Sequence, residues 1–372
     1  MKQIICLSET KWSNNPERTQ RLLTLLDEDV KVLFFELTVT ENPLHSWKQR
    51  GSEHLREVEA GISVCHAPLV CYQKGHPDRM SVRSSIRRIA KYINQRVTEC
   101  GFEHAIIWTD TPLSSALLEY IPHQYLIYDC YRSWDRYPVK LESDLAYRAD
   151  LVFAASPNLF DHVSPCNNSV FLLENGVDCS GFESQMQAVE ADASIACLSR
   201  PIFTYLGDIS KSVQLEPLLF TAGQHQEWTF VIVGRVSNRN PHYKDLKDFD
   251  NIRCIGYHPH SSYPACLMAS DVCFDLLHND ITDEDVVSER IYCYLASGLP
   301  IAAMYPARND PEFPDVIYSA QNEADFEYAC LCASSEGDRS KPELRRNYAA
   351  QADWAVRGET LRSVLDTSGL MM

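Results

Sequence analysis

The sequence predicts an α/β protein built from two doubly wound domains, each with a parallel sheet covered by helices on both faces. Short apolar runs alternate with helical patterns along almost the whole chain, which is typical of βαβ units. The 372 residues are long for one hydrophobic core and comfortable for two. The alternation pauses at residues 178–200, a polar stretch without a strong strand pattern. We therefore expect the boundary between the two domains near residue 178.

The first half of the chain holds the first set of strands and helices. Runs of about five to seven apolar residues separated by helical patterns are expected to form buried parallel strands. The strand-like runs are residues 3–7, 30–37, 62–68, 105–109, 125–129, 151–155 and 170–174. The helical patterns are residues 17–26, 81–100, 113–120, 139–148 and 157–163.

The second half repeats this pattern after the pause. Its strand-like runs are residues 202–207, 229–234, 252–257, 272–276, 300–304 and 316–319. Its helical patterns are residues 213–222, 263–269, 288–297 and 323–333, followed by one long helix at residues 344–365. Ligands of doubly wound folds bind beyond the carboxyl ends of the strands, so functional residues are expected there.

The charge balance argues against nucleic acid as the partner. The chain has 34 basic and 51 acidic side chains and a formal net charge of −17, whereas phosphate contacts need clustered Lys and Arg. The same balance disfavours broad electrostatic adhesion to an anionic membrane. Apolar runs are too short for a signal peptide or a membrane helix, so we expect a cytoplasmic location.

The fourteen cysteines do not follow a metal or disulfide pattern. No C-x-x-C pair occurs, and most cysteines lie in apolar runs, where a thiol acts as a small hydrophobic group. We therefore expect reduced core thiols in a reducing compartment, and no metal. His258 and His260 form an H-P-H sequence without suitably spaced Cys or carboxylate partners, so we expect them to be turn residues.

Two strand ends carry a glycine followed by polar residues, which favours an anionic ligand. These are YLGDISK at residues 205–211 and FVIVGRV at residues 230–236. Glycine lets the backbone approach a ligand closely, and Lys211 and Arg235 place mobile positive charge beside the turns. The alternative is a tight turn without a ligand. A P-loop motif is absent, and no G-x-G-x-x-G follows the first strand, which disfavours a nicotinamide-dependent dehydrogenase.

Residues 271–303 combine a strand, a long acidic loop and a helix that begins near Val287. On a helix facing the cleft, Arg290 could pair with a phosphate. The acidic side chains before the helix have a simpler explanation, because carboxylates stabilise the positive end of the helix dipole.

An ordered series of sequence blocks resembles the GT-B glycosyltransferases of the retaining glycosyltransferase family 4, especially bacterial enzymes that build surface polysaccharides. In the second half the blocks are LLENGVDCSGF (172–182), PIFTYLGDI (201–209), TFVIVG (229–234), NIRCIGYHPHSSYPACLMASDVCFDLL (251–277) and SERIYCYLASGLPIA (288–302). The first half contributes YLIYDCYRSW (125–134) and SPNLFDHV (156–163), and the end contributes ADWAVRGETL (352–361). The resemblance covers nearly the whole chain.

This resemblance implies a fold and a reaction. Two Rossmann-like domains would face each other across a cleft, residues 1–178 on the acceptor side and residues 179–350 on the nucleotide-sugar side. Residues 351–372 would form a helix that crosses back to the first domain. The implied reaction moves a sugar from a nucleotide-sugar donor to a glycan or lipid-linked acceptor, with retention and without a metal ion or cofactor. It leaves room for a weak peripheral association with the inner face of the membrane.

The resemblance also implies a donor site in the second domain. In this family the loop at Gly207 lies near the diphosphate, and the basic residue that pairs with the diphosphate falls on Arg290. Two family glutamates, which contact the donor sugar and the ribose hydroxyls, fall on Asp285 and Cys293, and a neutral thiol is a poor acceptor for a ribose diol. The implied catalytic residues are Asp285, Arg290 and Lys211, and the implied donor-binding residues are Gly207, Asp208, Gly234, Arg235, Ser288 and Cys293.

Acceptor groups are expected at strand ends of the first domain. The candidates are Trp12, Asp110, Asp129 and Arg132. Each candidate also has a structural explanation as a cap or as loop packing, and Trp12 either stacks on a sugar ring or covers the core.

Departures from the family pattern keep other functions open. Asp208 stands where the family often has Arg, Arg132 stands where it often has Asp, and Cys293 replaces a glutamate. These changes motivate a GT-B-shaped binding or scaffold protein that has lost catalysis. An epimerase on the same fold is a third hypothesis.

Overall fold

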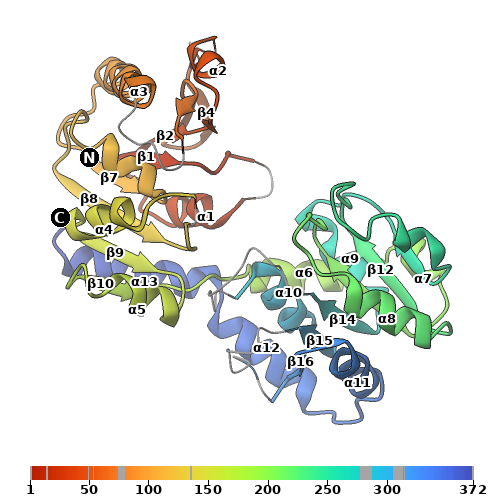
Figure 1. Cartoon of the computed structure of the whole chain (residues 1–372). Coiled ribbons are helices and arrows are strands. Elements are labelled where there is room, and N and C mark those ends of the chain that lie inside the picture. Colours follow the sequence, from red (N-terminus) through yellow and green to blue (C-terminus); the bar gives the residue numbers. More distant parts are fainter. Residues whose placement is uncertain are drawn as a thin grey trace. The chain divides into compact units, whose positions relative to one another are not determined.

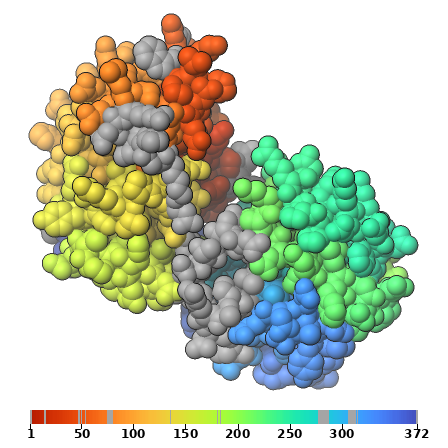
Figure 2. All heavy atoms as spheres, in the orientation of Figure 1, coloured from red at the N-terminus to blue at the C-terminus, as the bar shows by residue number. Residues whose placement is uncertain are grey.

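The computed structural model describes residues 2–13, 16–48, 50–52, 54–73, 80–134, 136–276, 287–304, 313 and 315–370. Among these, the contacts define two units. Unit 1 contains the chain up to Glu174 and from Arg357 onward, and unit 2 contains the described residues between them. Figure 1 shows the elements of both, and in the spheres of Figure 2 unit 2 runs from green to blue. Each unit is described by itself.

Unit 1 is built on a sheet in the order β10-β9-β8-β7-β1-β2-β5-β4. All pairs are parallel except β4 with β5. The parallel strands lie where the apolar runs predict them: β1 (Gln3–Ser8), β2 (Lys31–Glu36), β5 (Ile62–His66), β7 (Ile106–Thr109), β8 (Tyr125–Cys130), β9 (Leu151–Ala154) and β10 (Val170–Leu172). The pattern misses β4 (Arg56–Glu59), because its mostly exposed charged residues form an edge strand without an apolar run.

Helices and short strands complete unit 1 (Figure 1). The helices are α1 (Arg18–Thr24), α2 (Pro43–Lys48), α3 (Met80–Glu99), α4 (Val139–Arg148) and α5 (Pro157–Val163), with a 3-10 helix at Pro112–Ala116. A small second sheet pairs β3 (Val39–Thr40) with β6 (Val70–Cys71). Side chains of β1, β2, β7, β8 and β9 pack with those of α3, α4 and α5 into one apolar core.

Unit 2 has a six-stranded parallel sheet in the order β13-β12-β11-β14-β15-β16. In chain order these strands run 3-2-1-4-5-6, the arrangement of doubly wound nucleotide-binding folds. The strands are β11 (Ile202–Leu206), β12 (Thr229–Val233), β13 (Ile252–Cys254), β14 (Val272–Asp275), β15 (Ile301–Met304) and β16 (Ile317–Ala320). The order reverses between β11 and β14, so a crevice is expected at their carboxyl ends.

The helices of unit 2 include two from the polar stretch between the halves. These are α6 (Cys179–Ala188) and α7 (Ala193–Ala196), and they are followed by α8 (Glu216–Gln224), α9 (Tyr263–Met268), α10 (Glu289–Ser297), α11 (Glu323–Ser334) and α12 (Lys341–Gln351), with 3-10 turns at Asp245–Asp248 and His260–Ser262.

The prediction of one long helix at residues 344–365 is wrong. Helix α12 ends at Gln351, and α13 (Trp354–Thr367) begins after a break. The break is stabilised by Val177, whose backbone N–H donates to the Ala352 carbonyl at 3.0 Å and whose carbonyl accepts from the Trp354 N–H at 2.9 Å. Helix α13 then continues in unit 1, where Arg362 donates to the Leu25 carbonyl at 2.7 Å.

Candidate functional site

The carboxyl ends of β11 and β14 in unit 2 carry the polar residues of the candidate site. Gly207 follows β11, Asp275 ends β14, and Arg290 lies in the first turn of α10. Tyr294, one turn further along α10, accepts a hydrogen bond from the Leu206 N–H at 2.8 Å and donates to the Phe274 carbonyl at 3.1 Å. A single helix is therefore fixed to both strands at the point where the sheet order reverses.

Arg290 is held at these strand ends by its neighbours. Its Nη2 lies 2.7 Å from Asp275 Oδ1, its Nη1 donates to the Leu206 carbonyl at 3.1 Å, and its guanidinium lies 4.5 Å from the centre of the Tyr205 ring. The two charged side chains are only 16% and 13% exposed. Burial is the largest single influence and would lower the pKa of Arg290, but Asp275, Tyr205 and Tyr294 together outweigh it, so the pKa lies above its ordinary value. A permanent, oriented cation therefore lies at the carboxyl ends of β11 and β14.

Two glycines let the turns after β11 and β12 lie against each other. Gly207 has a φ of +114°, which side-chain-bearing residues rarely adopt, and a Cβ there would meet Arg290 Nη1 at 3.1 Å. A Cβ on Gly234 would lie 2.0 Å from the Gly207 carbonyl oxygen, which is far inside contact distance. The predicted glycine turns therefore meet at one place, and Gly234 is required for the close approach of the backbones.

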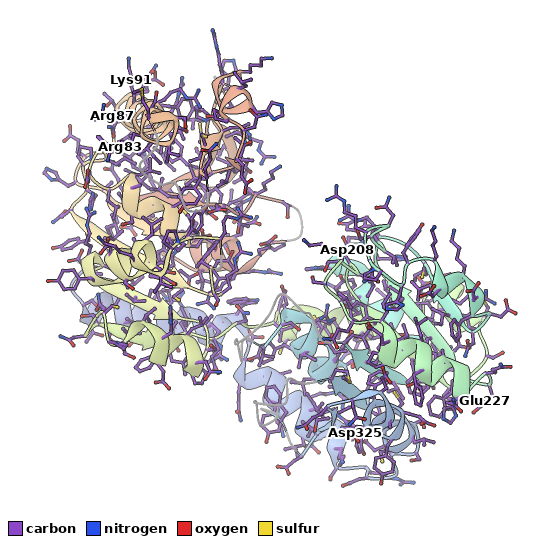
Figure 3. All side chains as sticks on the ribbon, in the orientation of Figure 1. Arg83, Arg87, Lys91, Asp208, Glu227 and Asp325 are labelled. Atoms are coloured by element: carbon purple, nitrogen blue, oxygen red, sulfur yellow. The ribbon has the colours of Figure 1, made fainter. Side chains whose placement is uncertain are left out.

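The structure corrects the expectation that Arg235 is a mobile cation. Asp208 binds it through Nε at 2.9 Å and Nη2 at 2.7 Å, and also accepts from the Arg235 backbone N–H at 2.8 Å. Asp208, labelled in Figure 3, therefore balances the charge that Arg235 would bring. Lys211 lies exposed on the same loop.

Helix α10 carries two further predicted residues. Ser288 caps the helix by accepting a hydrogen bond from the Ile291 N–H. Cys293 is 7% exposed and packs in the apolar core together with Tyr263 of α9. The predicted catalytic residue Asp285 lies outside the described residues.

A cavity of about 690 Å³ opens at the other end of the unit 2 sheet. It is lined by residues next to the amino ends of β12 and β13, among them Glu227, Asp248, Asp250 and Arg253. Glu227 and Asp208 lie on opposite sides of unit 2 in Figure 3. The three carboxylates that line this cavity are a poor match for an anionic ligand, so the Arg290 site remains the stronger candidate.

Unit 1 also gathers polar groups where its sheet order reverses, between β1 and β7. Asp110, which follows β7, is fully buried and accepts hydrogen bonds from Ser8 Oγ at 2.5 Å and Thr19 Oγ1 at 2.7 Å. Burial raises the pKa of Asp110 to about 7, although these two hydrogen bonds oppose the shift. The prediction from the strand end thus falls on a carboxyl group that titrates near neutral pH.

The other acceptor-side candidates have structural partners. Asp129 is fully buried and forms a two-pronged ion pair with Arg18, whose Nη2 also donates to the Leu173 carbonyl at 2.6 Å. The Trp12 ring packs edge-on against Phe34 at 5.2 Å, which favours the core-covering interpretation. Arg132 is exposed, with its guanidinium 4.0 Å from the Trp134 ring centre.

Three residues of these sites escaped the sequence prediction. The sequence predicts only a strand at Asp275, which provides the carboxylate that orients Arg290, and only a helix at Arg18, which neutralises Asp129. Glu9 accepts from Thr111 Oγ1 at 2.6 Å and Tyr137 Oη at 2.5 Å in unit 1. The sequence shows each of them only as a charged residue near the end of a strand or helix. It does not show which residue will be its partner in the folded chain.

Comparison with solved structures identifies the fold as GT-B. A UDP-forming α,α-trehalose-phosphate synthase from Burkholderia vietnamiensis aligns over 100% of both chains at a TM-score of 0.72 and 11% identity. A trehalose-6-phosphate structure from E. coli bound with UDP-2-fluoro glucose aligns over 98% of this chain and 99% of that one, at 0.70 and 12%. HepE from Anabaena in complex with UDP aligns over 99% and 100%, at 0.65 and 14%. The fold prediction is confirmed.

A sequence relative carries a functional name. The provisionally named teichuronic acid biosynthesis glycosyltransferase TuaH of Bacillus subtilis (strain 168) is 23% identical over 278 residues, which is 68% of this chain and 69% of TuaH. No family model matches the sequence. Within the described residues, no helix combines the length and the hydropathy needed to cross a membrane.

Proposed function

We propose that this protein is a glycosyltransferase that moves a sugar from a nucleotide-sugar donor to a glycan or lipid-linked acceptor in polysaccharide biosynthesis. The observation that carries the proposal is the buried, oriented Arg290 beside the Gly207 turn, at the carboxyl ends of β11 and β14. This is where doubly wound folds bind nucleotides. The likeness to UDP-bound GT-B structures and to TuaH supports the same proposal. Retention and membership of family 4 rest on the sequence resemblance.

The chemistry of the proposed reaction needs positive charge more than it needs a nucleophilic side chain. Negative charge grows on the leaving nucleoside diphosphate, and a preorganised guanidinium stabilises that charge without reorganising during the reaction. Asp275 keeps Arg290 in position but also competes with the diphosphate for it. The exposed Lys211 would add a second cation. The roles of Asp285 toward the donor sugar and of Cys293 toward the ribose rest on the sequence resemblance, and the burial of Cys293 in the core does not support its role. Neither a metal ion nor a cofactor takes part in this proposal.

The acceptor would lie on unit 1. Of the four acceptor-side candidates Arg132 is exposed, whereas Asp110 and Asp129 are fully buried. A stripe of exposed cations (Arg83, Arg87 and Lys91) runs along α3 and is labelled in Figure 3. In an otherwise acidic protein, this α3 stripe supports a weak peripheral association with an anionic membrane that holds a lipid-linked acceptor.

The test is nucleotide binding by a variant that removes the cation without leaving Asp275 unpaired. The double variant Asp275→Asn with Arg290→Gln should keep its melting temperature but bind nucleoside diphosphates about 10- to 100-fold more weakly, because hydrogen bonds to charged groups contribute about 1.5–3 kcal/mol. Titration calorimetry with a panel of nucleoside diphosphates measures the loss. The matched control Arg253→Gln removes an exposed charge at the other end of unit 2 and should bind like the wild type.

The outcomes separate the two main hypotheses. A folded double variant with unchanged affinity would refute the diphosphate role of Arg290. If the wild type binds no nucleoside diphosphate or nucleotide-sugar at millimolar concentration, the scaffold hypothesis replaces the enzyme. Release of nucleoside diphosphate that depends on an added acceptor separates transfer from epimerisation.

A further inference from the structure

Three potential metal ligands from separate parts of unit 2 meet beside α9. Asp192 precedes α7, His258 lies in the loop after β13, and Cys266 lies on α9. One carboxylate oxygen, one ring nitrogen and the thiol sulfur all lie within 4.8 Å of one another. The sequence predicts a turn residue at His258, because Asp192 and Cys266 do not stand at a familiar metal-ligand spacing from it.

The imidazole of His258 is oriented as a ligand would be. Its Nδ1 lies 3.1 Å from the Gly256 carbonyl oxygen, which can only accept, so Nδ1 carries the proton of that hydrogen bond. Nε2 of a neutral ring then presents its lone pair toward Asp192 Oδ2, 3.9 Å away. This distance is too long for a hydrogen bond, so the pair leaves room for an ion that both atoms could bind once Nε2 is unprotonated. Metal-binding histidines commonly donate their other N–H to a backbone carbonyl in this way.

The Asp192 carboxylate is also positioned before any ion arrives. Its Oδ1 accepts from the Ser194 N–H at 2.9 Å and from Ser194 Oγ at 2.5 Å, while its own N–H donates to the Ala265 carbonyl at 3.0 Å. Oδ2 is thereby directed to the cluster. Cys266 is fully buried, whereas the side chains of Asp192 and His258 remain 22% and 23% exposed. An ion could therefore enter from the solvent side, and a water could complete its coordination.

We propose that Asp192, His258 and Cys266 bind a zinc ion. A mixed oxygen, nitrogen and sulfur set suits Zn²⁺, which binds such ligands tetrahedrally. Tetrahedral bonds of normal length place the ligand atoms about 3.4–3.6 Å apart, so the cluster must contract modestly around the ion. The ion joins the segment between the two halves of the chain to α9 and to the loop after β13. Its role is structural, and it is independent of the proposed transfer reaction.

The test uses the full-length protein after chelator treatment and dialysis. Co²⁺ serves as a spectroscopic substitute for Zn²⁺, because a bound thiolate gives a charge-transfer band and tetrahedral Co²⁺ absorbs strongly in the visible. We expect one Co²⁺ per chain, displacement by one Zn²⁺, and a melting temperature that rises with Zn²⁺ concentration. His258→Gln and Cys266→Ala should each lose the band and the Zn²⁺-dependent rise.

Two control variants separate this site from adventitious binding. His260→Gln removes the neighbouring histidine, and Cys197→Ser removes an exposed thiol; both should bind Co²⁺ like the wild type. His258 is partly exposed, so its variant should remain folded even if the Cys266 variant does not. The proposal is overturned if the wild type shows no thiolate band and no stabilisation by Zn²⁺, or if a folded His258→Gln keeps both. Loss of the band in Cys197→Ser alone would equally overturn it.

Discussion

Replacing Asp110 by asparagine should change how the stability of unit 1 depends on pH. Asparagine keeps the oxygen that accepts from Ser8 and Thr19 and resembles the protonated acid in charge. In the folded protein burial is the main cause that raises the pKa of Asp110, from 3.8 to about 7, with smaller contributions from the carboxylates of Asp129 and Glu9. The folded state therefore holds the Asp110 proton more tightly than the unfolded chain does.

The sign and size of the effect follow from this difference. Below pH 4 the carboxyl group is protonated in both states and contributes no pH dependence. Between pH 4 and pH 7 only the unfolded chain ionises, so the wild type loses about 1.4 kcal/mol of stability per pH unit relative to the variant. The accumulated difference is up to about 4 kcal/mol and becomes constant above pH 7.

Urea unfolding of both proteins at a series of pH values measures this slope. The quantity of interest is the free energy of unfolding of wild type minus that of Asp110→Asn, because the offset from the buried amide cancels in the slope. The control Asp144→Asn makes the same charge change on the exposed face of α4 and should not reproduce the slope. A difference that stays constant from pH 4 to pH 7 would show that the buried carboxyl does not titrate as the structure indicates.

Two further predictions concern the glycine contact and the α3 stripe. Gly234→Ala should destabilise unit 2 by about 1–3 kcal/mol and weaken nucleoside diphosphate binding, because its Cβ would overlap the Gly207 carbonyl. Gly223→Ala, whose Cβ would make an ordinary contact in α8, should instead stabilise by about 0.5–1 kcal/mol in the same denaturation assay; equal effects would exclude the overlap. Arg87→Glu should reduce cosedimentation with anionic vesicles about tenfold or more, whereas Lys140→Glu on α4 should not, and equal losses would point to net charge instead of the stripe.

The sequence determined the elements of the sheets because their signal is local. A buried parallel strand needs a short continuous apolar run, and each such run in the chain became a strand. The strand-end glycines Gly207 and Gly234 were also visible, since close backbone approach excludes a side chain. The edge strand β4 was missed for the same reason: its residues are mostly exposed, so it has no apolar run.

The tertiary structure alone decided which of these residues meet. Arg290 was recognisable as a helix-borne cation, but only the order of strands in the sheet brings it to Asp275. Val177 ends α12 through hydrogen bonds that no helical pattern records. Asp192, His258 and Cys266 have no motif spacing, because a ligand set drawn from three elements depends on distances through space and not along the chain. The sequence therefore specified the elements and the residue types, while the packing of those elements created the sites.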